Sequence, residues 1–129
     1  MFFTEKNGTL KMMDMIQQRI NIFLQAGMIE SSEVQVLNQW LAVIDEYSKD
    51  YDKEKMERLI THSAMMMKRQ RENAVVDSMP EFIFESVKEE AHYEDCVRLY
   101  EKMNAIFPVS ENEKKYLILH LCGLYGSES

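Results

Sequence analysis

Residues 52–71, DKEKMERLITHSAMMMKRQR, decide the fold. Asp52 is suited to cap a helix, because its carboxylate can accept the unpaired N–H groups of a first turn. Apolar or small side chains then recur every three or four residues: Met56, Leu59, Ile60, Ser63, Ala64 and Met67. This spacing places them on one face. The stretch therefore predicts an amphipathic helix that runs to about Arg71.

The same pattern occurs on the N-terminal side of this helix. Thr9 is suited to cap a helix that runs to about Gln25, and Gly27 is suited to end it. Ser32 to Gln35 is a capping-box pattern, in which each of the two side chains meets a backbone N–H. It predicts a second helix to about Tyr47. The apolar positions of these two helices are Leu10, Met13, Ile16, Ile20, Phe23, Leu24, Val36, Leu37, Trp40, Leu41 and Ile44.

Two further capping-box patterns lie on the C-terminal side, at 78–81 and 110–113. The first has Pro80 in its first turn and predicts a short helix that carries Phe82, Ile83 and Val87. After a break near residues 92–94, another helix carries Cys96, Val97, Tyr100 and Met103 and ends before Pro108. The second pattern opens a last helix, to about Leu124, that carries His120.

Composition fits this helical pattern. The chain has 129 residues, with 46% apolar and 29% charged side chains, which is typical of one globular domain. It has 4 Gly and 2 Pro, and no segment alternates as a strand does. We therefore expect one domain over residues 1–129, an all-α bundle of five to six amphipathic helices, with residues 126–129 as a flexible tail.

Charge and cysteine usage exclude several classes of protein. The net charge of -7 is against nucleic-acid binding, because phosphate contacts require clustered Lys and Arg. Cys96 and Cys122 form no metal-type spacing, so we expect free thiols in a reducing compartment. No signal peptide and no apolar run of about 20 residues is seen, so we expect a cytoplasmic protein without a membrane span. No cofactor-binding loop or motif of a catalytic site is present.

His62 is the first candidate functional residue. On a helix it lies at the edge of the apolar face, with Arg58 one turn before it and Arg69 two turns after it. The two arginines would favour an anion near the imidazole. The alternative is an ordinary surface histidine with basic neighbours.

His120 is the second candidate, because it interrupts the apolar run from Tyr116 to Leu121. Its helical neighbours are Tyr116, Leu117 and Leu124, and Glu113 precedes it by seven residues. A ring in such a place is either a reactive group shielded from water or a core histidine that donates to a carbonyl.

A third histidine, His92, stands four residues before Cys96, a spacing at which two metal ligands share a helix face. Two ligands do not make a site, and we expect His92 at a helix start. A small metalloenzyme that uses this pair is therefore the remotest hypothesis, and we expect no metal.

Taken together, the two histidine stretches resemble PTS regulation domains. Residues 59–69 resemble the first histidine motif, and residues 107–109, Glu113 and 116–121 resemble the second. The histidines are 58 residues apart, and the resemblance extends over about residues 30–124. The sequence departs from the family pattern at Thr61, where Asp is frequent, and at Lys115, where Gly is frequent.

This resemblance implies a regulatory domain, not an enzyme, that the phosphoenolpyruvate:sugar phosphotransferase system phosphorylates on histidine. The implied acceptors are His62 and His120, and Arg69 matches the family's arginine. The implied phosphodonor is the phosphocarrier protein or an enzyme II component. We also expect a homodimer and a downstream protein partner. The rival hypothesis is a helical adaptor or dimerisation module with structural histidines.

Overall fold

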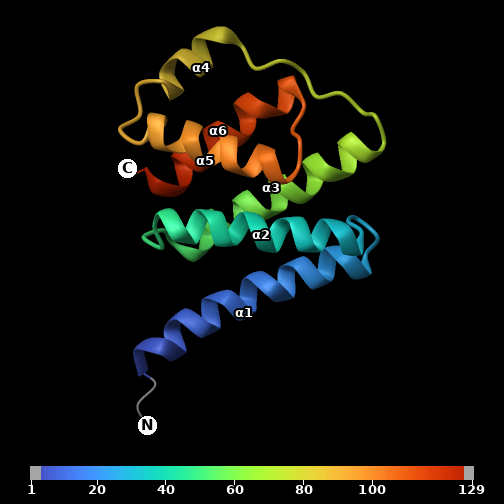
Figure 1. The fold of residues 1–129 in the computed structure, drawn as a ribbon, viewed down its shortest axis with the longest axis vertical. Helices are drawn as coiled ribbons and strands as arrows, with labels where there is room; N and C mark the ends of the chain where they lie inside the picture. Colours follow the sequence, from blue (N-terminus) through green and yellow to red (C-terminus); the bar gives the residue numbers. More distant parts are fainter. Residues whose placement is uncertain (1–3, 127–129) are drawn as a thin grey trace.

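The computed structural model describes residues 4–126, and it describes side chains from residue 14 onward. Its helices are α1 (Thr4–Gln25), α2 (Ser31–Tyr47), α3 (Lys53–Arg71), α4 (Glu81–Val87), α5 (Tyr93–Ile106) and α6 (Glu111–Tyr125). No strand occurs among the residues described, so the predicted all-α bundle is confirmed (Figure 1). Most of the predicted tail, residues 127–129, lies outside the described part of the chain.

The first helix ends as the sequence predicts but begins earlier. Gly27 has φ 77°, the left-handed conformation that favours glycine. The N–H of Met28 donates to Phe23 O at 2.9 Å, and the N–H of Gly27 donates to Leu24 O at 3.1 Å. This pair of bonds is the Schellman motif that closes many helices. The prediction of Thr9 as the cap is wrong, because α1 already starts at Thr4.

The predicted start of α2 is wrong for a tertiary reason. Ser32 lies inside the helix and does not cap it. The N-cap is Glu30, and the Glu33 side chain, not Gln35, reaches back to the backbone N–H of the N-cap. The Glu33 carboxylate accepts from the backbone N–H of Glu30 at 2.8 Å and from Nη2 of Arg71 at 3.0 Å. Since Arg71 also donates to Met28 O at 2.8 Å, the end of α3 is tied to the α1–α2 turn.

The α3 helix follows its prediction closely. Asp52 caps it, and its carboxylate accepts from the Lys55 N–H at 2.8 Å. All six residues of the predicted face are buried. At the other end Asn73, with φ 57°, precedes Ala74, whose N–H donates to Arg69 O at 2.8 Å. A non-glycine residue thus ends this helix as Gly27 ends α1.

The short helix α4 differs from its prediction. Pro80 is the N-cap, and the Ser78 hydroxyl donates to Asn112 Oδ1 at 3.2 Å instead of capping. Phe82 is 74% exposed, whereas Phe84 is buried. The reason is that this seven-residue helix packs mainly against α6, so only a narrow face is covered.

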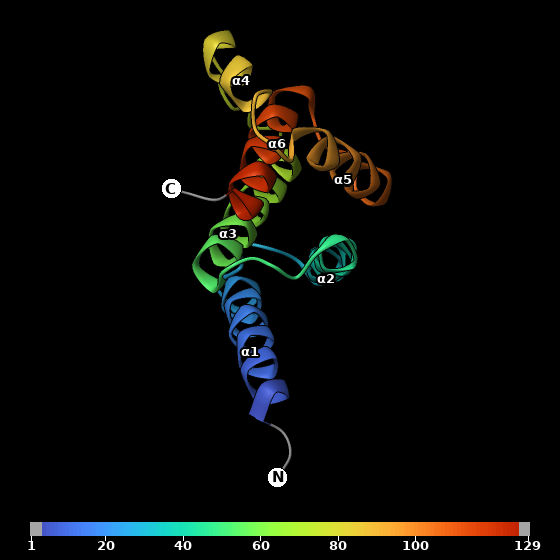
Figure 2. The same cartoon turned by 90° about the vertical axis from the view of Figure 1, so that its left-hand side faces the viewer.

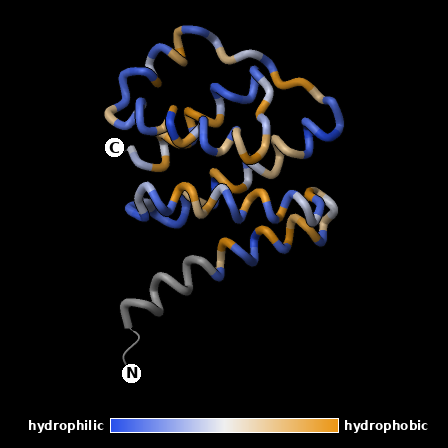
Figure 3. The backbone as a smooth tube through the Cα atoms, viewed as in Figure 1, coloured by the Kyte–Doolittle hydropathy of each residue, from blue (hydrophilic) through white to orange (hydrophobic). Residues whose placement is uncertain are grey.

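The other helices pack around α2, α3 and α6. The α2 helix packs on α5, and α3 and α6 lie side by side, as Figures 1 and 2 both show. Trp40 of α2 is 1% exposed, and its Nε1 donates to Met103 O at 2.9 Å. Apolar and polar residues alternate over short intervals along the helices, which gives each helix one face for this core (Figure 3).

Among the residues described, no helix has both the length and the apolar composition needed to cross a membrane.

Candidate functional site

The candidate site lies between α3 and α6, which run antiparallel. Arg69 of α3 contacts Glu113 of α6. His62, seven residues before Arg69, contacts His120, seven residues after Glu113. Near the start of α3, Lys55 Nζ donates to the carbonyl of Gly126 at 3.0 Å, which continues the same register. Residues about two helical turns apart on each helix therefore form successive cross-helix pairs.

The two predicted histidines meet face to face. Their ring centroids are 4.0 Å apart and the planes are inclined by 20°, so the imidazoles are stacked. His62 is exposed and His120 is partly buried, which is the order of accessibility expected from the sequence. Within residues 14–126, neither the His62 ring nor the His120 ring makes a hydrogen bond to the protein, whereas His92 does. The carbonyl acceptor required of a core His120 is therefore not present in this part of the chain.

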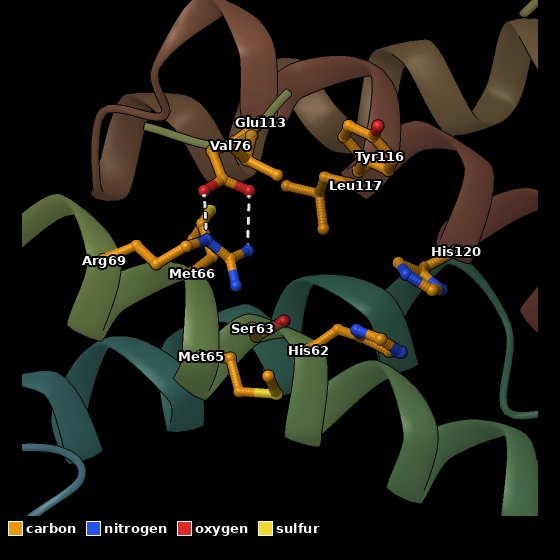
Figure 4. A pocket seen from close by; sticks show the side chains of 10 residues that line it. All are labelled: His62, Ser63, Met65, Met66, Arg69, Val76, Glu113, Tyr116, Leu117 and His120. Atoms are coloured by element: carbon orange, nitrogen blue, oxygen red, sulfur yellow. Dashed lines mark hydrogen bonds and ion pairs between the residues drawn. The ribbon is translucent and has the colours of Figure 1, made fainter. Parts of the chain in front are cut away.

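Arg69 and Glu113 form a two-bond ion pair beside the histidines. Arg69 Nε lies 2.7 Å from Glu113 Oε2, and Arg69 Nη2 lies 2.9 Å from Oε1 (Figure 4). The Glu113 side chain is 4% exposed, so a buried carboxylate in the first turn of α6 is neutralised from α3. The ion pair also raises the pKa of the Arg69 guanidinium, chiefly through its hydrogen bonds to Glu113.

These residues surround an open hollow of about 240 Å³. Its lining combines polar and apolar side chains: His62, Ser63, Met65, Met66, Arg69, Val76, Glu113, Tyr116, Leu117 and His120 (Figure 4). The 72–80 segment borders it and is fixed to α6, because Tyr116 Oη donates to Asp77 O at 3.0 Å. The hollow thus has rigid helical walls and an accessible imidazole.

The surroundings keep both imidazoles neutral near pH 7. Burial lowers the pKa of His120 to about 4, and the neighbouring His62 and Arg58 act in the same direction. Burial also lowers the pKa of His62, with Arg69 and Arg58 as further causes. A neutral imidazole has a free lone pair on one nitrogen, so each ring is a nucleophile in the physiological range.

The remaining predicted site residues occupy different surroundings. Arg58 is exposed on α3, one turn before His62, and no contact ties up its guanidinium among the residues described. Thr61 stands where the family pattern frequently has Asp, but its hydroxyl donates to Glu57 O at 2.8 Å. It therefore bonds its own helix and does not orient the His62 ring.

His92 and Cys96 have different surroundings. His92 stands at the start of α5, as expected, and its Nδ1 lies 3.2 Å from Tyr47 Oη. Cys96 is fully buried, and the neighbouring Cys122 thiol together with burial raises its pKa. The described residues contain no cluster of three or more possible metal ligands.

Two features of the site were not predicted from the sequence. The first is the Arg69–Glu113 pair, for which the sequence does contain a signal: Arg69 follows His62 by seven residues, and Glu113 precedes His120 by seven. The two spacings match only if the helices run antiparallel. Ser63 was assigned to the core, and it is 3% exposed, yet its hydroxyl has no hydrogen-bond partner.

Comparison with known proteins agrees with this arrangement. The family model of the PRD domain matches residues 40–124. The chain belongs to the PRD domain family. The resemblance to PTS regulation domains is thereby confirmed, although the match begins at residue 40 rather than about 30. No curated protein and no solved structure matches the chain.

The PRD match begins within α2, covers α3 to α5 and ends one residue before the end of α6, so both histidines and both arginines lie within it. Membership makes this a regulatory domain of the kind controlled by the phosphotransferase system. The helix α1 lies outside the matched region.

Proposed function

We propose that the protein is a regulatory domain in the cytoplasm that accepts a phosphoryl group on histidine from the phosphotransferase system. The observation that carries this proposal is the stacked pair of neutral imidazoles in an open hollow between α3 and α6. Structural histidines are normally held by hydrogen bonds, whereas these two have none within residues 14–126. The exposure of the His62 ring at this hollow favours the acceptor over the rival adaptor with structural histidines.

His62 is the acceptor that a donor protein reaches first. Its ring is exposed, whereas the His120 ring is partly buried behind it. A ring nitrogen of His62 attacks the phosphorus of the donor, a phosphocarrier protein or an enzyme II component. The new N–P bond forms while the donor's bond to phosphorus breaks, so the phosphoryl group moves and the domain catalyses nothing else. His120 is the second acceptor, reached after rearrangement of the stacked pair.

Arg58 and Arg69 support the negative charge that this transfer brings. A phosphoryl group adds roughly −1.5 to −2 charge and several acceptor oxygens. Arg58 is exposed beside His62, and only two of the five N–H groups of Arg69 are used by Glu113. Charge-assisted hydrogen bonds from these guanidinium groups lower the free energy of the phosphorylated state.

The readout is a change in protein association. We propose a homodimer, because two-fold pairs are the commonest assembly and Val75 and Phe82 are 82% and 74% exposed. A dianionic group added at a packed surface changes the stability of that surface, and the downstream protein partner senses the difference. Light scattering at tens of micromolar should give about twice the mass of one chain; the mass of a single chain would contradict the dimer.

The proposed transfer is tested by incubation with labelled phosphoenolpyruvate and the two general phosphotransferase proteins, with several enzyme II components as further donors. We expect label that is labile in acid and stable in base, as phosphohistidine is. The double variant His62→Ala/His120→Ala should take up none. Label that persists in the folded double variant, or its absence from the wild-type protein with every donor, would refute the function.

A further inference from the structure

Ser63 is the polar group of the hollow that has no structural explanation. Its side chain is 3% exposed and its hydroxyl makes no hydrogen bond. A buried hydroxyl without a partner costs roughly 1–3 kcal/mol. Serine and threonine in helices commonly donate to the carbonyl four residues back, as Thr61 does to Glu57 O and Ser86 does to Phe82 O. The Ser63 hydroxyl leaves this bond unmade.

The orientation of this hydroxyl points to a ligand. Ser63 lies on the floor of the hollow, and Figure 4 shows its oxygen directed into the space between α3 and α6. A serine side chain changes between its staggered positions by rotation about χ1 alone. The Ser63 O–H can therefore turn towards a group that enters the hollow.

Arg69 offers a second unused donor in the same space. Glu113 occupies Nε and Nη2, and Figure 4 shows the third nitrogen of the guanidinium turned away from Glu113 and into the hollow. The remaining donors are planar and permanently charged, which suits an oxyanion. Glu113 opposes an anion here, but Arg58 and Arg69 together leave the surroundings with an excess of positive charge.

We propose that the Ser63 hydroxyl and the free nitrogen of Arg69 form a cradle for a tetrahedral oxyanion. In this cradle Ser63 is a positioning residue, which donates to a phosphoryl oxygen while the histidine carries the phosphorus. The inference rests on the proposed function where the oxyanion is the phosphoryl group of His62, and a free phosphate ion offers the same chemistry. The hollow, at about 240 Å³, has far more than the roughly 15 Å³ that one water requires.

The test compares Ser63→Ala with Ser86→Ala in the full chain. Both variants remove a helical serine hydroxyl, but Ser86 is exposed on α4 and lies outside the hollow. The first readout is the ratio of phosphorylated to free protein at equilibrium with the donor. We expect this ratio to fall about tenfold in Ser63→Ala, because a hydrogen bond to a charged group is lost, and to stay unchanged in Ser86→Ala.

A purely structural Ser63 would behave differently. If Ser63 only holds a ligand, Ser63→Ala should leave the unmodified protein as stable as the wild type or more stable, because the hydroxyl removed has no partner there. The phosphorus NMR signal of the phosphohistidine should also move in Ser63→Ala, since one oxygen loses its donor. A loss of stability with an unchanged ratio and an unchanged signal would overturn a role in holding the phosphoryl group.

The second readout is a titration with inorganic phosphate, followed by the amide signal of Ser63 and the Nε signal of Arg69. Saturable shifts that weaken in Ser63→Ala support the cradle even if the wild-type protein takes no label, in which case the proposed function fails and the oxyanion is a free one. If Ser63→Ala binds inorganic phosphate more weakly but takes up as much label as the wild type, the cradle binds free phosphate and not the phosphoryl group of His62. Label ratios and titrations that are equal in wild type and Ser63→Ala would overturn the cradle and leave the function standing.

Discussion

Two clusters of aromatic and titratable side chains differ in how completely their polar atoms are bonded. The tyrosine cluster, Tyr47, Tyr51 and Tyr125, lies where the end of α2, the α2–α3 loop and the end of α6 meet. Each of its hydroxyls has an acceptor: Tyr51 donates to Asp45, Tyr47 donates to Asp95 at 2.7 Å, and Tyr125 donates to Ser48 O at 2.7 Å.

The hollow between α3 and α6 has the opposite character. His62 and His120 make no hydrogen bond within residues 14–126, and the Ser63 hydroxyl is buried without a partner. The Ser63 hydroxyl destabilises the fold, because it is buried without a partner, and the two rings add no protein hydrogen bond to the fold. The tyrosine cluster thus adds bonds that hold the fold together, whereas the hollow keeps polar groups that a ligand could use, as the proposed function requires.

The Arg69–Glu113 pair is bonded although it lines the hollow, and we expect it to give the largest stability effect. Arg69→Ala leaves the buried Glu113 carboxylate unpaired, which should destabilise the protein by roughly 3 kcal/mol in urea unfolding. The matched control is Lys68→Ala, which breaks the exposed pair with Glu72 and should cost about 0.5 kcal/mol or less. Equal losses in the two variants would show that the Glu113 carboxylate does not depend on Arg69.

The second prediction concerns pH. The folded pKa of His120 is about 4, whereas its ordinary value is 6.5, so the unfolded state binds more protons between these values. Stability is therefore full above pH 6.5 and falls as the pH drops towards 4, by roughly 2–3 kcal/mol for this group. His120→Gln removes this titration, so the unfolding free energy of the variant should fall less than that of the wild type between pH 6.5 and 4, and the difference between the two should change over this range. Parallel curves would contradict the buried neutral ring.

The smallest effects compare two tyrosine hydroxyls directly. Tyr125→Phe removes a partly buried hydroxyl that also lies 3.1 Å from Ile44 O, and we expect a loss of about 1 kcal/mol. Tyr116→Phe removes one exposed bond at the rim of the hollow, to Asp77 O, and should change stability by less than about 0.5 kcal/mol. Thermal unfolding of both variants gives the answer, and the reverse order would undo the contrast between the clusters.

Two local sequence signals predicted helix ends correctly, whereas the local caps predicted at Thr9 and Ser78 were wrong. Asp52 and Gly27 act within their own turns, and both were identified from the sequence. Ser32 was chosen wrongly because Glu33 also binds Arg71, from a helix more than thirty residues away. The bond between Glu30 and Glu33 is local, but no pattern within α2 indicates the contact with Arg71.

The site shows the same division. The edge position of His62 follows from helical periodicity and was predicted correctly. The stacking of His62 on His120 depends on which faces of α3 and α6 meet, and that is fixed by packing over 58 residues of chain. The unpartnered hydroxyl of Ser63 could not be predicted, because a serine at this position in the helix has the spacing of an ordinary small core residue.

The central claim is that the unbonded histidines carry the function and the bonded one does not. Its most direct measurement is the amount of acid-labile label taken up from phosphoenolpyruvate by His62→Ala, His120→Ala and His92→Ala, each first shown to be folded by circular dichroism. We predict that His62→Ala loses most of the label, and that His92→Ala, which removes the ring bonded to Tyr47, keeps it in full. Label lost only in His120→Ala would reverse the order of the two acceptors. Label lost in His92→Ala but retained in the other two variants would contradict the account.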